Sequence, residues 1–213
     1  MKLTVHTFLS MDGVMQGPGG VEEDPSGGFD RGGWLVPFVD DDFSSIVDGW
    51  FEQADEFLFG RSTYDLMAGY WPEVTEPDNR VATLLNGCPK HVVSRTLQNP
   101  SWANTTVLPG DVVDAVSALK SRPGRELQVH GSSQLAQTLH NAGLVDEYRL
   151  LIFPVVLGVG KRLFPEGSRP TSFSRTSGGV TSTGVTHQVL RPTEFRTGGL
   201  SVEDGRERLD VAP

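Results

Sequence analysis

The sequence has few of the cysteine and histidine residues from which disulfides and zinc sites are built. Cys88 is the one cysteine among 213 residues, and five histidines are scattered along the chain. A single cysteine excludes an internal disulfide, and no run of Cys and His has the spacing of a zinc site. We therefore expect no bound metal.

Long apolar runs and an excess of positive charge are also missing. No stretch approaches the roughly 20 apolar residues of a membrane span, and residues 1–11 lack the apolar run and cleavage site of a signal peptide. With 18 Lys and Arg against 27 Asp and Glu, the formal net charge of -9 repels polyanions. We expect a cytoplasmic protein that binds small molecules, and neither nucleic acid nor a membrane as partner.

Short apolar runs alternate with helical patterns along most of the chain. Hydrophobic residues make up 37% and charged residues 21%, as in ordinary globular domains. The alternation predicts a single α/β domain over residues 1–200, in which crossover units surround a largely parallel sheet. The expected strands are 3–9, 57–59, 91–94, 127–129 and 148–153, and the expected helices include 43–51, 81–85, 112–120 and one that ends at Gly143.

Three further segments are not part of that alternation. Residues 17–33 are rich in glycine and too long for a tight turn, which is typical of a mobile loop over an active site. Residues 172–177 and 185–190 have the pattern of a closing antiparallel pair. From residue 201 the sequence is polar and charged, and we expect a frayed tail over 201–213.

Three predicted strands end in residues suited to phosphate. The segments are Gly60-Arg61-Ser62-Thr63, Ser94-Arg95 and Gly131-Ser132-Ser133. Ligands of open α/β sheets bind at this edge, where glycine lets a phosphate approach the N–H groups of a helix start and arginine adds a planar fork of donors. Each motif taken singly is equally compatible with an ordinary cap or turn, whereas the three together favour a nucleotide.

Two familiar nucleotide fingerprints are absent. No Gly-x-Gly-x-x-Gly follows the first strand. Gly160-Lys161 is preceded by Val155 where a P-loop has its first glycine, and is followed by Arg162 where it has Ser or Thr. Neither a conventional Rossmann site nor a P-loop is therefore predicted.

Segments 10–13, 57–72, 92–97 and 129–165 together resemble dihydrofolate reductase family proteins that share the C-terminal reductase domain of the bifunctional riboflavin deaminase-reductase. The resemblance implies a dihydrofolate-reductase-like three-layer fold, with a mixed, mostly parallel eight-stranded sheet and flanking helices. It also implies NADPH across the strand ends, and a homodimer. The apolar strands and the four tryptophans point the same way, because we expect them to leave surface patches that a dimer would bury. The deaminase partner needs a pair of cysteines, so this chain resembles the reductase alone.

The resemblance also implies roles for individual residues. Gly60, Arg61, Ser62 and Thr63 would hold phosphates, Ser94 and Arg95 would meet the adenosine 2′-phosphate, and the backbone near Leu9 and Ser10 would take the nicotinamide carboxamide. Gly131, Ser132, Ser133, Gln134 and Leu135 would hold the pyrophosphate. Trp34, Pro154 and Gly158 are the candidates for substrate contacts, although Val159 separates two glycines where family members usually have adjacent ones.

A reductase usually needs an acid that delivers a proton to the atom next to the hydride acceptor. Asp41 and Asp42 are the candidates by position, and Asp12 is the alternative. A competing interpretation is that Asp41 and Asp42 only complement the start of a helix.

The sequence thus predicts an NADPH-dependent reductase that transfers a hydride to a small pterin-like, pyrimidine-like or sugar-derived carbonyl or imine. Preference for NADPH over NADH is expected because Arg95 lies at the third strand end and residues 91–101 contain no Asp or Glu. The alternative is a non-catalytic nucleotide- or pterin-binding module that acts as a sensor, a carrier or a drug-sequestering protein.

Overall fold

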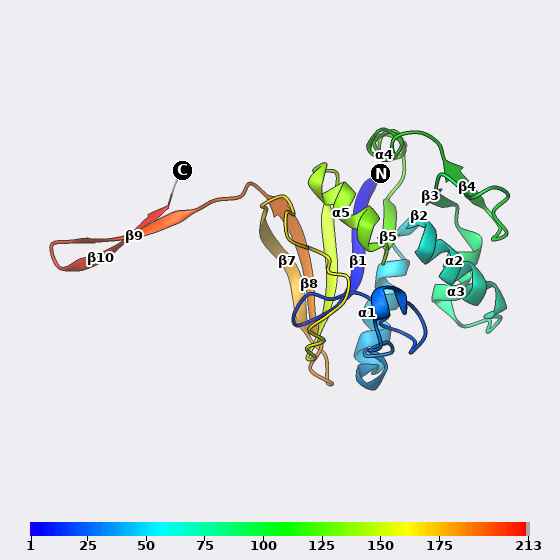
Figure 1. The fold of residues 1–213 in the computed structure, drawn as a ribbon, viewed down its shortest axis with the longest axis horizontal. Helices are drawn as coiled ribbons and strands as arrows, with labels where there is room; N and C mark the ends of the chain where they lie inside the picture. The colour runs from blue at the N-terminus through cyan, green and yellow to red at the C-terminus, as the bar shows by residue number, and fades with distance from the viewer. Residues whose placement is uncertain (212–213) are drawn as a thin grey trace.

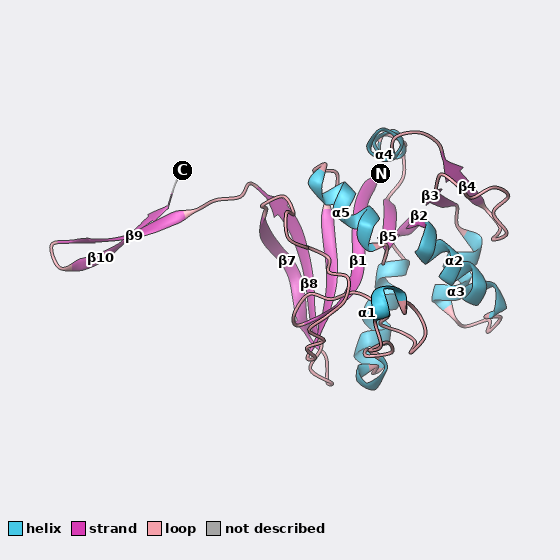
Figure 2. Cartoon of the chain, viewed as in Figure 1, coloured by secondary structure: helices cyan, strands magenta, loops and turns pink. Residues whose placement is uncertain are grey.

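The computed structural model describes residues 1–211, and its body is one mixed sheet covered by helices (Figures 1 and 2). Eight strands follow the spatial order β4-β3-β2-β5-β1-β6-β8-β7. The strands are β1 (Lys2–Ser10), β2 (Ala54–Gly60), β3 (Lys90–Val93), β4 (Thr105–Leu108), β5 (Glu126–His130), β6 (Glu147–Phe153), β7 (Ser172–Val180) and β8 (Thr186–Thr193). The predicted α/β fold with a mixed, mostly parallel sheet is confirmed.

The first six strands of this spatial order, from β4 through β3, β2, β5 and β1 to β6, are parallel. Strands β8 and β7 complete the sheet as antiparallel neighbours. The crossovers contain α1 (Asp41–Phe51), α2 (Arg61–Tyr70), α3 (Arg80–Gly87), α4 (Val112–Lys120) and α5 (Ser133–Asn141). Short 3₁₀ turns lie at Ser26–Gly28, Val36–Phe38 and Trp71–Glu73. No helix among the described residues is long and apolar enough to span a bilayer.

The helices bury apolar side chains on both faces of the sheet. Along β2, Leu58 enters the core beneath α4 and α5, whereas Phe57 and Phe59 enter the core beneath α1, α2 and α3. Successive strand residues point to opposite faces, so a strand covered on both sides is apolar throughout. This is why the central strands were readable as short continuous apolar runs.

Two parts of the chain differ from the sequence prediction. Strand β4 was not predicted, because Thr105–Leu108 is a short edge strand that is only partly buried. The expected frayed tail is wrong for the described residues, since β9 (Gly198–Glu203) and β10 (Arg206–Val211) form an antiparallel hairpin. Asp204 and Gly205 make its turn with positive φ angles of 52° and 74°, the backbone that an Asp-Gly hairpin turn requires.

The tryptophans do not form the surface patches that the sequence suggested. Trp34, Trp50 and Trp102 are buried in the cores of the single chain, and Trp71 is partly buried. The argument for a homodimer from exposed tryptophans is therefore wrong, and a dimer needs support from another surface.

Candidate functional site

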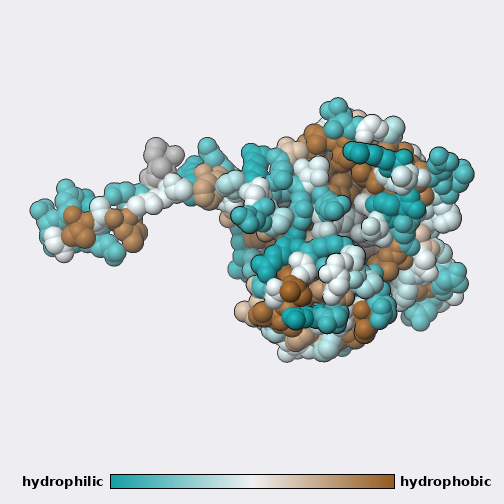
Figure 3. Space-filling view, viewed as in Figure 1, coloured by the Kyte–Doolittle hydropathy of each residue, from teal (hydrophilic) through white to brown (hydrophobic). Residues whose placement is uncertain are grey.

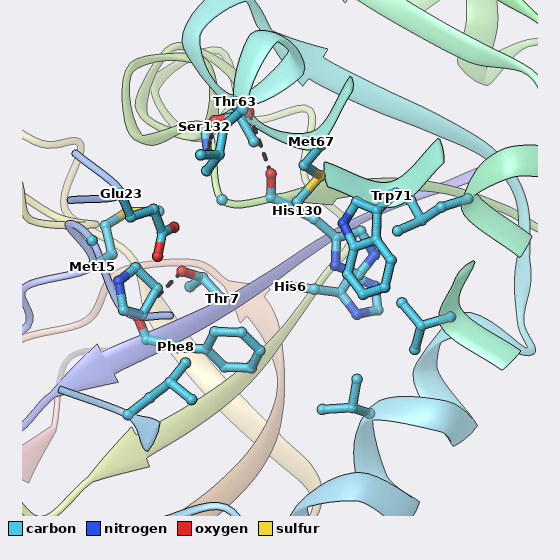
Figure 4. Close-up of a pocket in the computed structure, with 18 of the residues that line it drawn as sticks. His6, Thr7, Phe8, Met15, Glu23, Thr63, Met67, Trp71, His130 and Ser132 are labelled. Carbon is cyan, nitrogen blue, oxygen red and sulfur yellow. Dashed lines mark hydrogen bonds between the residues drawn. The ribbon is translucent and has the colours of Figure 1, made fainter. Parts of the chain in front are cut away.

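A cavity of about 730 Å³ lies at the carboxyl ends of β1, β2 and β5. Its walls come from α1, from the starts of α2, α3 and α5, and from the glycine-rich loop 17–33. Figure 4 shows Glu23 and Thr7 toward one side of this cavity, and His6, His130 and Trp71 toward the other. Carboxyl ends of parallel strands are where open α/β sheets bind ligands.

Two of the three predicted phosphate motifs form one continuous part of the wall. All nine residues of Gly60–Thr63 and Gly131–Leu135 line the cavity. The backbone N–H of Gly60 donates to Ser132 Oγ (3.0 Å), and the N–H of Ser132 donates to Thr63 Oγ1 (3.1 Å). These bonds place the N-termini of α2 and α5 side by side.

The N-termini of α2 and α5 differ from the other helix starts. In α1, α3 and α4 the side chains of Asp40, Asn79 and Asp111 accept from the first N–H groups. Neither α2 nor α5 has a side-chain cap. The first turns of these two helices therefore keep free donors, and the helix dipoles add positive potential, which together suit an anion.

The third motif lies beside the cavity and outside its wall. Ser94 Oγ accepts from the N–H groups of Thr96 (3.2 Å) and Leu97 (3.0 Å), which makes a tight turn after β3. Arg61 Nη1 donates to Thr96 Oγ1 (3.4 Å), so this turn adjoins the start of α2. Arg95 is exposed, and within residues 1–211 it has no ion pair.

Asp12 connects the end of β1 to the loop after β6 through its hydrogen bonds. It accepts hydrogen bonds from Ser10 Oγ (2.7 Å) and from the N–H groups of Leu157 (3.0 Å) and Gly158 (2.8 Å). Burial opposes the charge, but these donors outweigh it and lower the pKa of Asp12 to about 2. Asp12 and the adjacent Leu9 and Ser10 are not in the cavity wall.

Asp41 and Asp42 also lie outside the cavity wall. Both are exposed in the first turn of α1, and Asp42 accepts from the N–H of Ser182 (2.9 Å). Asp40 is the N-cap, and its bond from Phe43 N (2.7 Å) is the chief cause of its lowered pKa. This geometry agrees with the competing interpretation, in which these acids complement a helix start.

The three substrate-contact candidates lie outside the cavity wall as well. Trp34 is buried, donates from Nε1 to the carbonyl oxygen of Gln16 (2.8 Å) and packs edge-on against Phe153. Pro154 and Gly158 are exposed on the loop after β6. Their proximity to the ligand stays a prediction.

The cavity contains carboxylates that the sequence did not single out, among them Glu23 and Asp48. Glu23 lies on the glycine-rich loop, where its Oε2 accepts from the N–H groups of Gly19 (2.5 Å) and Gly20 (3.0 Å). Burial raises the pKa of Glu23 despite these bonds. Nothing in the local pattern indicates this position, because it depends on how the loop folds back over the sheet.

Two buried histidines in the cavity wall were also missed. His6 and His130 are partners in the β1–β5 register, and their rings stack with centroids 4.7 Å apart. His130 also stacks on Phe51 at 4.3 Å. Burial is the main cause that lowers the pKa of His130 to about 3 and the pKa of His6 well below its usual value, so both rings are neutral near pH 7.

The hydrogen bonds of Gln128 fix the tautomer of His130. Gln128 Nε2 donates to the carbonyl oxygen of Trp50 (2.7 Å) and to Glu126 (2.8 Å), which leaves Oε1 to face His130 Nε2 (2.9 Å). Nε2 of His130 must carry the proton, because an amide oxygen only accepts. Nδ1 of His130 is therefore a lone-pair acceptor in the wall of the cavity.

The chain is an α/β protein with a mixed sheet, a cavity at its parallel strand ends and two uncapped helix starts in the wall of that cavity. Comparison with protein families is more specific, since residues 1–186 match the model of the RibD C-terminal domain. The chain belongs to this family, as the resemblance in the sequence implied, and membership indicates a reductase.

Individual relatives agree with this assignment. The protein YyaP of Bacillus subtilis (strain 168) is 32% identical over 190 residues, which cover 88% of this chain and 93% of that protein. A crystal structure from Shewanella sp. PV-4 with a provisional riboflavin-biosynthesis name superposes with a TM-score of 0.65 at 22% identity, over 91% of this chain and 100% of that one. The structure of a pyrimidine reductase-like protein from Corynebacterium diphtheriae superposes with a TM-score of 0.62 at 15% sequence identity, over 91% of this chain and 92% of that one. Both structures share the fold.

Proposed function

We propose that the chain is an NADPH-dependent reductase that transfers a hydride to a small pterin-like, pyrimidine-like or sugar-derived carbonyl or imine. The observation that carries the proposal is the pair of adjacent helix starts, α2 and α5, that lack side-chain caps and line one cavity. Gly131 has a φ of +59° there, which glycine adopts without strain. These features suit the pyrophosphate of a dinucleotide.

The chemistry that we propose divides the cavity into two parts. The starts of α2 and α5 hold the phosphates, and the apolar side chains of Phe8, Phe43 and Val47 give the remainder a dry wall. NADPH supplies the hydride when bound. Glu23 is the carboxyl that we propose as the proton source, because its raised pKa favours the protonated form that a general acid needs.

Cofactor selectivity tests the placement of the 2′-phosphate. We expect Arg95→Ala to weaken NADPH binding about ten- to a hundredfold, because it removes a charge-assisted hydrogen bond of roughly 1.5 to 3 kcal/mol. NADH binding should barely change. The measurement is the pair of dissociation constants from fluorescence titration, with Arg196→Ala, another exposed arginine, as the matched control. A wild-type ratio of the two constants near one, or a ratio that Arg95→Ala leaves unchanged, would contradict the placement.

Turnover distinguishes a reductase from a binding module. NADPH oxidation is measured across a panel of pterin, pyrimidine and sugar-derived carbonyl or imine compounds, and Glu23→Gln should lower kcat about a hundredfold with little change in NADPH affinity. Tight NADPH binding without oxidation of any compound would favour the non-catalytic alternative. Tight binding of a folate-like drug without NADPH would favour a sequestering protein.

A further inference from the structure

The cavity at the carboxyl ends of β1, β2 and β5 contains a histidine nitrogen that the protein leaves without a partner. His130 lines this cavity and is only 8% exposed. Its Nε2 faces Gln128, and among residues 1–211 nothing forms a hydrogen bond with its Nδ1. Buried polar atoms nearly always have a hydrogen-bond partner. A free acceptor in a buried wall therefore indicates a ligand that supplies a donor.

The neighbouring His6 has an unpaired nitrogen of a different kind. Its Nε2 lies 2.8 Å from Thr4 Oγ1, and its Nδ1 is completely enclosed by protein without a partner. His130 Nδ1 also lacks a partner but is not enclosed in this way. A ligand in the cavity can therefore reach His130 Nδ1, whereas His6 Nδ1 is out of its reach.

The ring of His130 is held in one orientation and one protonation state. It stacks on Phe51 of α1 with ring centroids 4.3 Å apart, and on His6 of β1 at 4.7 Å. A half turn of the ring would remove its Nε2 from Gln128 Oε1, which lies at 2.9 Å. Burial lowers the pKa of His130 to about 3, so the ring gains no second proton near neutral pH. Nδ1 is thus a preformed acceptor.

The surroundings of His130 suit a flat ring better than a chain of hydroxyl groups. Figure 4 shows Met67 and Trp71 on the same side of the cavity as His130, and Val47 and Phe51 of α1 also line this cavity. Ligand sites are typically apolar, with a few polar groups that select the ligand. Hydroxyl groups of a sugar would find no partner on these apolar side chains. A planar heterocycle can bury its faces against them and needs a partner only at its edge.

We propose that His130 is a specificity-determining residue, whose Nδ1 accepts a hydrogen bond from a ring N–H of a planar heterocyclic substrate. The proposal rests on the proposed function and narrows its substrates to pterin-like and pyrimidine-like compounds that present an N–H, in preference to sugar-derived compounds. An analogue that carries a methyl group in place of that hydrogen leaves the acceptor unpaired and binds more weakly.

The experiment compares two probes that differ only at their ring nitrogens. Lumazine is a pteridine dione with two ring N–H groups, and 1,3-dimethyllumazine has methyl groups in place of both hydrogens. Their dissociation constants are measured from probe fluorescence, with and without NADP⁺, for the full chain and for His130→Phe, which keeps an aromatic ring against Phe51. We expect His130→Phe to weaken lumazine binding about tenfold and to change the affinity for the dimethyl form less than about twofold.

The matched control is His187→Phe, because His187 contacts Trp50 but does not line the cavity. This variant should leave the affinities for both probes unchanged. Cooperative thermal unfolding and unchanged NADPH affinity show that His130→Phe is folded.

Nuclear magnetic resonance of the wild type gives a measurement that needs no variant. The ¹⁵N resonances of His130 should show the proton on Nε2 in the free protein, and the Nδ1 resonance should shift with lumazine but not with the dimethyl form. A wild type that does not bind lumazine, an equal loss of affinity for both probes in His130→Phe, or a proton on Nδ1 in the free protein would overturn the proposal. Preference for lumazine without any NADPH oxidation would uphold selection by His130 and contradict the reductase.

Discussion

The fold keeps the imidazole of His130 neutral at mildly acidic pH, where a histidine in water would be protonated. Its pKa lies at about 3, mainly because the ring is buried, and Gln128 keeps its proton on Nε2. An unfolded histidine has a pKa near 6.5. As pH falls below this value, His130 becomes protonated in the unfolded chain but stays neutral in the folded chain. Stability associated with His130 is thus full above about pH 6.5 and is lost progressively toward pH 3.

We predict that His130→Gln removes part of this acid sensitivity. Glutamine retains an N–H for Gln128 but cannot titrate. Between pH 6.5 and 4 the wild type should lose up to about 1.4 kcal/mol per pH unit more than the variant. Urea unfolding at a series of pH values measures the difference. Identical slopes for the two proteins would show that the imidazole is protonated in the folded state.

At the scale of elements, the glycine-rich loop 17–33 is held by contacts at two points and is exposed between them. Gly33 N donates to the carbonyl oxygen of Gly17 (2.8 Å), and Lys161 forms an ion pair with Asp24 (2.6 Å). Between these anchors, Gly27 and Gly28 have positive φ angles and are exposed. The loop also supplies Glu23 to the cavity wall, so its position decides whether the proposed acid is in place.

We predict that this loop becomes more ordered when cofactor and substrate are both bound. Contacts to ligands would restrict glycines that have little intrinsic stiffness. Hydrogen exchange read by mass spectrometry should slow over residues 17–33, while helix α4, which contributes nothing to the cavity wall, serves as the internal control. Equal exchange in the loop with and without ligands would contradict this prediction.

At the scale of the whole molecule, the proposed cofactor site and the root of the C-terminal hairpin β9–β10 lie at opposite ends of the sheet. The large cavity adjoins the carboxyl ends of β1, β2 and β5. The hairpin leaves from the end of β8, an antiparallel strand whose last residues lie near Tyr148, at the start of β6. Figure 3 shows the hairpin projecting from the body of the molecule on a thin neck. A second cavity, of about 520 Å³, adjoins this root, and no described residue lines both cavities.

We predict that NADPH binding is independent of the homodimerisation that the family resemblance implies. Two binding events influence each other only through a coupling free energy, and that coupling is reciprocal. The NADPH dissociation constant should therefore agree within about twofold below and above the concentration of dimer formation, and saturating NADPH should not shift the sedimentation profile. A shift in either direction would reveal coupling through the sheet.

Much of the secondary structure was readable from the sequence because it depends on local patterns. The helix predicted for residues 112–120 with Asp111 as its cap is found with the same bounds, and the helix expected at 43–51 begins two residues earlier. The expected closing antiparallel pair is present as β7 and β8. Strand-end glycines were informative too, because Gly60 and Gly131 both lie in the cavity wall.

The sequence by itself determined most of the strands and helices, the family, and the two glycine-bearing motifs at the ends of β2 and β5, since each depends on residues close together in the chain. Tertiary structure decided which side chains share the cavity. His6 meets His130 only through the β1–β5 register, and Glu23 reaches the wall only through the path of a long loop. Asp41, Asp42 and Trp34 are near the site in sequence but face elsewhere, because the direction of a side chain is set by the packing of its whole element.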